Sequence, residues 1–308
     1  MGLSTVDAFK HISAKGCVVL DDVQLKKLQN VLMGIFLDII SVCQKHNIRY
    51  YLSGGTALGA VRHQGFIPWD DDIDINMPRR DYLRFAKIFA EEMGEKYWVH
   101  TPDFTEDYNL LLGRVRKKGT CVKTKEDFSR DECGAFVDIF IIENTYDNPI
   151  VRGFHGFLCL ATGLLQSCRK FYADRTELLK LVSDKKNRRV FQIKIAIGFC
   201  VSFLSVGAWT KLTNRCNGMC KNSTTGYVVI PSGRKHFFGE IQPRAEFLES
   251  VEMPFEGTQV SVCKCYDRYL TALYGDYMTP PTDNKESHVF LQPFDLGEKA
   301  TTRTGEYV

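Results

Sequence analysis

Apolar side chains recur every three or four positions between residues 25 and 46, and this spacing predicts an amphipathic helix. The apolar run at 48–52 predicts a short strand, Ser-Gly-Gly at 53–55 interrupts it, and residues 56–62 suit a helix. A strand that leads through a glycine turn into a helix N-terminus presents backbone N–H groups to an anion.

Aspartate and apolar residues alternate at 73–77, which predicts a second strand that carries aspartates. Pro78 fits the first turn of a following helix, whose aromatic face belongs to the core. Further strands are predicted at 97–100, 110–116 and 135–142, and the pattern is mainly helical from 149 to about 220. We therefore expect an α+β protein with a mixed β-sheet core flanked by helices and a mainly helical C-terminal half.

The same patterns divide the chain into an N-terminal extension (1–24), a core (25–148), a helical and mixed region (149–296) and a loose tail (297–308). Two apolar segments, 154–167 and 195–209, are shorter than the ~20 residues of a membrane span. Basic residues flank both segments. The two apolar segments and their basic flanks predict either a pair of buried helices or a surface that rests on an anionic membrane.

Composition narrows the class of protein. The 308 residues include 40 Lys and Arg against 37 Asp and Glu, a net charge of +3 that does not suit a dedicated nucleic-acid binder. Eleven scattered cysteines and an N-terminus without a continuous apolar segment predict a reducing, cytoplasmic setting with free thiols.

Four aspartates crowd into residues 70–74, and their mutual repulsion calls for a positive partner. Asp72 and Asp74 are two apart in the predicted strand and therefore share one face, where hard oxygen ligands suit Mg²⁺ or Mn²⁺. Asp138, the one acid in an apolar run, is the expected third ligand, because a buried lone aspartate is costly. The alternative for Asp138 is a strand-end residue bonded to backbone.

The neighbouring residues suit a phosphate group. The amides of Gly54, Gly55 and Thr56 are expected to cradle phosphate, since glycine lets a backbone approach closely. Arg62 is a candidate phosphate clamp, with a surface ion pair to the aspartate cluster as the alternative. Arg116 either reaches a diphosphate or is a solvated strand-end charge. A glycine turn, an Asp-x-Asp pair and a third aspartate on another strand are together typical of the nucleotidyltransferase fold.

Two longer strings make the match more specific. The sequences LSGGTALGAVRH at 52–63 and GFIPWDDDID at 65–74 closely resemble the LicD family, whose relatives include fukutin and fukutin-related protein. The resemblance continues at MPRRDY (77–82) and FVDIF (136–140), and near the C-terminus at FGE (238–240), YGDYM (274–278) and His288. It spans most of residues 25–288 and is weakest at 150–220.

The resemblance implies transfer of a substituted phosphate from a CDP-activated donor to a glycan hydroxyl or a lipid-linked glycan, with release of CMP. CDP-choline is the first expectation, and CDP-ribitol and CDP-glycerol stay open. Asp72, Asp74 and Asp138 are the expected metal ligands, and Asp138 has general base as a second role. A nucleotidyltransferase proper and a non-catalytic binding module are the rival interpretations. The expected location is cytoplasmic, at the inner face of the cell membrane if the apolar segments touch lipid.

Overall fold

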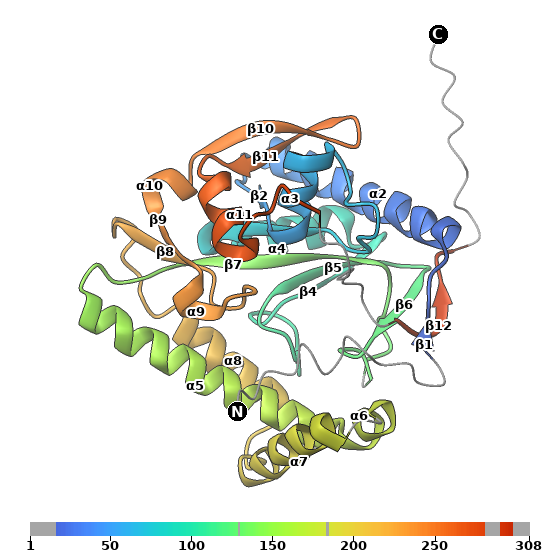
Figure 1. Ribbon diagram of the computed structural model, residues 1–308, viewed down its shortest axis with the longest axis vertical. Helices are drawn as coiled ribbons and strands as arrows, with labels where there is room; N and C mark the ends of the chain where they lie inside the picture. The colour runs from blue at the N-terminus through green and yellow to red at the C-terminus, as the bar shows by residue number, and fades with distance from the viewer. Residues whose placement is uncertain (1–16, 129, 183–184, 281–289, 298–308) are drawn as a thin grey trace.

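The computed structural model describes residues 17–128, 130–182, 185–280 and 290–297 (Figure 1). The longer helices are α2 (Asp22–His46), α3 (Gly54–His63), α4 (Arg79–Met93), α5 (Pro149–Ala173), α6 (Arg175–Leu181), α7 (Lys185–Cys200), α8 (Val206–Asn217) and α11 (Tyr266–Tyr274). Two helical turns, α9 (His236–Gly239) and α10 (Arg244–Phe247), lie between the last strands.

The main sheet contains β2 (Tyr51–Leu52), β3 (Asp74–Pro78), β7 (Phe136–Asn144), β5 (Gly113–Lys117) and β4 (Tyr97–His100), in that order. β3 and β7 pair in parallel and the other neighbours are antiparallel, so the sheet is mixed. The end of β7 also pairs with β8 (Tyr227–Val229), which pairs with β9 (Ile241–Pro243).

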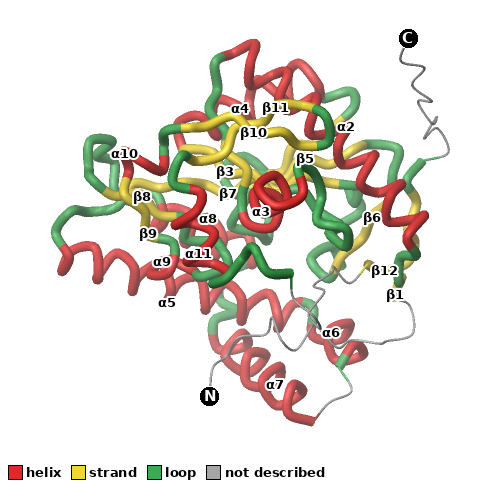
Figure 2. Tube along the Cα trace, turned by 45° about the horizontal axis from the view of Figure 1, so that its top comes forward, coloured by secondary structure: helices red, strands yellow, loops and turns green. Residues whose placement is uncertain are grey.

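Two smaller sheets flank the main one. β1 (Cys17–Val18), β12 (Phe290–Asp295) and β6 (Cys121–Thr124) form one of them. The hairpin of β10 (Ser250–Phe255) and β11 (Thr258–Cys263) forms the other and contacts β2 and α3. Segments from both ends of the chain therefore meet around the same core (Figure 2).

Helix α2 shows how the sequence pattern produces the core. Asp21 caps its N-terminus, because the Asp21 carboxylate accepts from the backbone N–H of Gln24, and the Gln24 side chain accepts from the backbone N–H of Asp21. The apolar stripe Leu28, Leu32, Ile35, Ile39 and Val42 is buried as the spacing predicted.

The main sheet has two chemically different faces. Helices α2 and α4 pack on an apolar face (Figure 1), which is formed by Ile75, Met77, Val99, Val115, Val137, Ile139 and Ile141. Residues in register with one another across neighbouring strands point to the same side of a sheet. The opposite face therefore carries Asp74, Asn76, His100, Arg114, Arg116 and Asp138.

The expected α+β class is confirmed, and several boundaries differ. β3 begins at Asp74, so Asp72 precedes the strand rather than lying in it. β6 and the β10–β11 hairpin were not predicted, although β6 and β10 alternate in burial, because each segment is only four to six residues long. The division at residue 148 stays a prediction. Residues 1–16 and 298–308, most of the proposed extension and tail, lie outside the described residues.

Close packing of helix α3 gives a prediction for glycine substitutions. A Cβ on Gly59 would lie 2.4 Å from the carbonyl oxygen of Gly65, whereas a Cβ on Gly34 would meet nothing within 4 Å. Gly59→Ala should lower the free energy of unfolding by about 1–3 kcal/mol, and Gly34→Ala in α2 should raise it by about 0.5–1 kcal/mol. Urea denaturation measures both. Equal effects would contradict the close approach of α3 to residue 65.

Candidate active site

Three charged residues form a row across the polar face of the sheet. Asp74 on β3 is in register with Asp138 on β7, and Asp138 is in register with Arg114 on β5. The pairing brings together two of the three carboxylates that the sequence predicted to share a site. The parallel β3–β7 pairing fixes this neighbourhood, because a slip of one residue would turn Asp138 to the apolar face.

Arg114 forms a bidentate ion pair with Asp138. Its Nε and Nη2 donate to the two carboxylate oxygens at 2.5 and 2.6 Å, and its guanidinium carbon lies 3.7 Å from the ring centre of Phe136. Burial disfavours the charge on Arg114, but the Asp138 carboxylate more than offsets this and leaves the pKa of Arg114 raised. Both oxygens of Asp138 thus have a charged partner rather than a backbone one, and metal binding by Asp138 stays a prediction.

The glycine turn lies against carboxylates. Gly54 has a φ of +48°, a conformation that suits glycine. A Cβ on Gly55 would lie 3.1 Å from Oδ2 of Asp70, and a Cβ on Gly54 would lie 3.4 Å from the Tyr274 hydroxyl and 4.0 Å from Oδ2 of Asp74. The N-terminus of α3 and the start of β3 therefore meet at one place.

Hydrogen bonds tie this place to the C-terminal helix α11. The Tyr269 hydroxyl lies 3.2 Å from Oγ of Ser53 and accepts from the N–H of Gly54 at 3.3 Å. Thr56 accepts from the backbone N–H of Asp74 at 2.9 Å through its hydroxyl. One of the three amides expected to cradle phosphate thus already has a protein partner, and phosphate contact by Gly54, Gly55 and Thr56 stays a prediction.

The two predicted phosphate-binding arginines have different surroundings. Arg62 donates from Nη1 to the carbonyl oxygen of Tyr277 at 2.6 Å. Burial lowers its pKa and the charge of Asp70 partly restores it, which agrees with the ion-pair alternative. Arg116 is buried and pairs with Asp127 at 2.5 Å, so it is not a solvated strand end. Burial and the charge of Arg114 lower the pKa of Arg116.

Within the described part of the chain, no three His, Cys, Asp or Glu side chains come close enough to hold a metal ion as a group. Mg²⁺ in phosphoryl-transfer sites is commonly bound by one or two carboxylates together with substrate phosphates. Asp72 and Asp74, both half-buried at the start of β3, supply oxygen ligands of the required kind. The residues present therefore suit a metal that a phosphorylated substrate completes.

Arginine donors without partners lie on the same face. Among the residues that the structure describes, Nη1 of Arg114 and both Nε and Nη1 of Arg116 are buried and have no hydrogen-bond partner. An unsatisfied buried donor is costly, and an anionic ligand is one way to satisfy it.

The sequence analysis assigned no role to Glu240. Glu240, between α9 and β9, is buried, and its Oε1 accepts from the backbone N–H of Lys235 at 3.1 Å. No described group pairs with its Oε2, and burial raises the pKa of Glu240 to about 7. Its charge acts on Tyr269, whose hydroxyl contacts Gly54. The only available signal was the FGE string at 238–240, which carries no spacing rule for chemistry.

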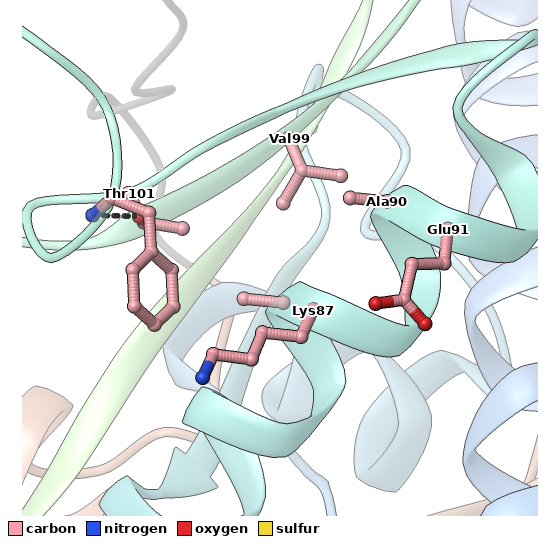
Figure 3. A pocket seen from close by; sticks show the side chains of 7 residues that line it. Lys87, Ala90, Glu91, Val99 and Thr101 are labelled. Carbon is pink, nitrogen blue, oxygen red and sulfur yellow. Dashed lines mark hydrogen bonds between the residues drawn. The ribbon is translucent and has the colours of Figure 1, made fainter.

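A surface cleft of about 330 Å³ lies elsewhere, between α4 and β4 (Figure 3). Lys87, Glu91 and Val99 are among its lining residues, and Nζ of Lys87 lies 5.3 Å from the ring centre of Phe104. None of the predicted site residues lines it. His288, the other family-like position near the C-terminus, lies outside the described residues.

Comparison with known proteins shows which family the chain resembles. Residues 47–151 match the family model described as LicD/FKTN/FKRP, nucleotidyltransferase domain, and this range includes every predicted site residue. The resemblance to the LicD family is therefore confirmed.

Individual relatives agree with the family model. The chain is 29% identical over 294 residues, 88% of its length and 98% of the relative, to the lipopolysaccharide cholinephosphotransferase LicD of Haemophilus influenzae. It is 36% identical over 56 residues to human ribitol 5-phosphate transferase FKRP, a stretch of 18% of this chain and 11% of the relative. An uncharacterised protein of Rickettsia prowazekii is 36% identical over 113 residues, 34% of this chain and 38% of the relative.

The buried Arg114–Asp138 pair should be costly to break from one side. Asp138→Leu leaves the guanidinium without its carboxylate and should lower the free energy of unfolding by about 3–5 kcal/mol. The double variant R114M/D138L replaces both partners with apolar groups and should recover most of that loss. Chemical denaturation measures both variants. A double variant as unstable as the single one would show that the unpaired charge is not the cause.

The raised pKa of Glu240 predicts how stability depends on pH. The folded protein binds the Glu240 proton more tightly than the unfolded chain, whose value is near 4.5, so this group costs stability as the pH rises from 4.5 through about 7. Glu240→Gln should therefore raise the free energy of unfolding above pH 7, by up to about 3 kcal/mol, with no gain near pH 4. Denaturation at several pH values checks this, with the exposed Glu249→Gln as control. A gain that does not depend on pH would contradict the assignment.

Proposed function

We propose that this protein transfers a phospho-alcohol group, with phosphocholine as the first candidate, from a CDP-activated donor to a hydroxyl of a cell-surface glycan or its lipid-linked precursor. The observation that carries the proposal is the similarity to a lipopolysaccharide cholinephosphotransferase over 88% of the chain. The row of Asp74, Asp138 and Arg114 beside the glycine turn supports it, because it offers carboxylates for a metal and guanidinium donors for phosphate.

The donor diphosphate would lie between the N-terminus of α3 and the start of β3. The helix N-terminus favours negative charge. On the same face of the sheet, the buried Nη1 of Arg114 on β5 has no hydrogen-bond partner among the described residues. Asp72 and Asp74 would hold Mg²⁺ or Mn²⁺, which when bound neutralises charge on the phosphate oxygens and on the departing CMP.

A base that takes the proton of the acceptor hydroxyl completes the proposal. Asp138 retains this role beside that of metal ligand, although both of its oxygens accept from Arg114. Glu240 is a second candidate, because its pKa of about 7 matches a base that works near neutral pH. Burial and the charge of Glu240 raise the pKa of Tyr269, whose hydroxyl accepts from the N–H of Gly54.

The donor alcohol remains to be chosen by experiment. The similarity to human FKRP, a ribitol 5-phosphate transferase by its name, keeps CDP-ribitol beside CDP-choline, with CDP-glycerol as a third donor. A thermal-shift series with the three CDP-alcohols and Mn²⁺ would identify the donor, since at equal concentration the ligand that binds the folded state most tightly stabilises it most. We place the reaction in the cytoplasm, at the inner face of the cell membrane.

The product distinguishes this function from its main rival. Release of CMP from a CDP-alcohol, together with a phosphorylated glycan, supports the phospho-alcohol transferase. Release of pyrophosphate from CTP or ATP would instead indicate a nucleotidyltransferase that moves the nucleotide itself. Failure to bind both Mn²⁺ and cytidine nucleotides would indicate a non-catalytic binding module.

Asp72→Asn and Asp74→Asn test the metal site. Each removes one charged ligand from a site that supplies several kcal/mol to the transition state, so turnover of the CDP-alcohol should fall by about 100-fold or more. CMP release is the readout, and EDTA followed by Mg²⁺ or Mn²⁺ should abolish and restore it in the unchanged protein. Asp131→Asn, which makes the same change at an exposed acid, should keep full activity. Full activity of either site variant would remove these residues from the site.

A further inference from the structure

One face of helix α5 is exposed and apolar along most of the helix. Its exposed side chains recur at helical spacing, and the most exposed are Ile150 at 82%, Phe157 at 67% and Phe154 at 65%. The full stripe consists of Ile150, Val151, Phe154, Phe157, Leu160 and Leu164. Large apolar side chains that gather in a continuous exposed patch mark an interaction surface.

The opposite face of α5 is occupied by the protein itself. His155, Gly156, Cys159 and Thr162 are buried, and α5 packs against α7, α8 and α9. The helix runs along the outer edge of the molecule (Figure 1), and the stripe holds its exposed large apolar side chains. Because its opposite face is already packed, α5 can lie flat along an apolar surface but cannot be enclosed by a groove.

Charge is distributed unevenly in the same part of the chain. Residues 149–221 contain 13 of the 40 Lys and Arg residues but only 3 of the 37 Asp and Glu residues. This segment therefore carries a net charge of +10, although the whole chain carries only +3. Arg188 and Arg189 on α7 and Lys211 and Arg215 on α8 are exposed. An apolar stripe on α5, with exposed basic side chains on the two helices that pack against α5, matches the acyl boundary and headgroups of an anionic bilayer.

Helix α5 also contacts the segment that leads to Glu240. Phe238 in α9 is 52% exposed, and its ring packs so closely on Gly156 of α5 that a Cβ there would lie 2.5 Å from it. Glu240, whose charge acts on Tyr269, follows two residues later. The segment that carries Glu240 is therefore held against the helix that carries the stripe.

We infer that the exposed stripe of α5, with Phe238, is a docking surface for an anionic lipid bilayer. This inference rests on the proposed function and extends it, because it locates the acceptor at the membrane rather than in solution. The phenylalanines enter the acyl boundary, and the basic residues of α7 and α8 contact anionic headgroups.

Vesicle flotation tests the surface without any need for activity. The full chain is mixed with vesicles of equal parts phosphatidylglycerol and phosphatidylcholine, or of phosphatidylcholine alone. The wild-type protein should float with the anionic vesicles, and this binding should weaken in high salt. The double variant F154E/F157E should bind about ten-fold or more weakly, because two exposed aromatic side chains no longer enter the bilayer. R188Q/R189Q should lose affinity for the anionic vesicles only.

The matched control is V23E/L37E, which makes the same change at two exposed apolar residues of α2. It should bind like the wild type, and unchanged melting temperatures establish that all variants fold. The inference is overturned if the wild type fails to float at low salt, if F154E/F157E floats equally well, or if the control loses binding to the same extent.

A second readout separates this inference from the proposed function. F154E/F157E should retain CMP release with a water-soluble glycan fragment and lose it with an acceptor embedded in vesicles. Vesicle binding without turnover of any CDP-alcohol would refute the proposed function and leave the surface standing. Turnover with equal efficiency on soluble and embedded acceptors in both proteins would refute the role of the surface in acceptor access.

Discussion

The parallel pairing of β3 with β7 is the constraint on which the candidate site depends. It sets Asp74 beside Asp138, and β5 on the far side of β7 sets Arg114 opposite Asp138. The apolar residues that alternate with these charges are held by α2 and α4, so the register cannot slip without exposing the core. A bidentate, buried ion pair is tolerated here because each charge has its partner at hydrogen-bond distance. The active-site face is thus built by the same alternation that builds the core.

Local patterns predicted the elements that lie near one another in sequence. The apolar stripe of α2 and the glycine turn before α3 were legible because helical spacing and Gly-Gly are local signals. The convergence of Asp74 and Asp138 was also predictable, since an acid inside an apolar strand needs a partner. We predicted a metal ion as that partner, and in the structure the partner of Asp138 is Arg114. A basic strand end does not reveal whether its side chains face solvent or the sheet, and the same ambiguity concealed the burial of Arg116.

Contacts between distant segments could not be predicted from the chain. Tyr269 reaches the glycine turn because α11 packs on α3, and no local pattern in the sequence indicates that contact. The same holds for the charge of Glu240, which acts on Tyr269. Helix α5 illustrates the limit of the hydrophobic pattern in another way. Its residues 154–167 were correctly assigned to a helix, but apolar content alone did not separate the face that packs on α8 from the face that is exposed.

The hydrogen bond between Gly54 and Tyr269 has a consequence for biosynthesis. It joins residues 215 positions apart, so the glycine turn acquires this partner only after most of the chain has been made. Domains fold as they emerge from the ribosome, and pairings this distant form late. Strands β2, β3, β4, β5 and β7 of the main sheet are therefore synthesised well before this partner of the glycine turn. The end of the sheet at which we propose that phosphate binds is completed only when synthesis is almost over.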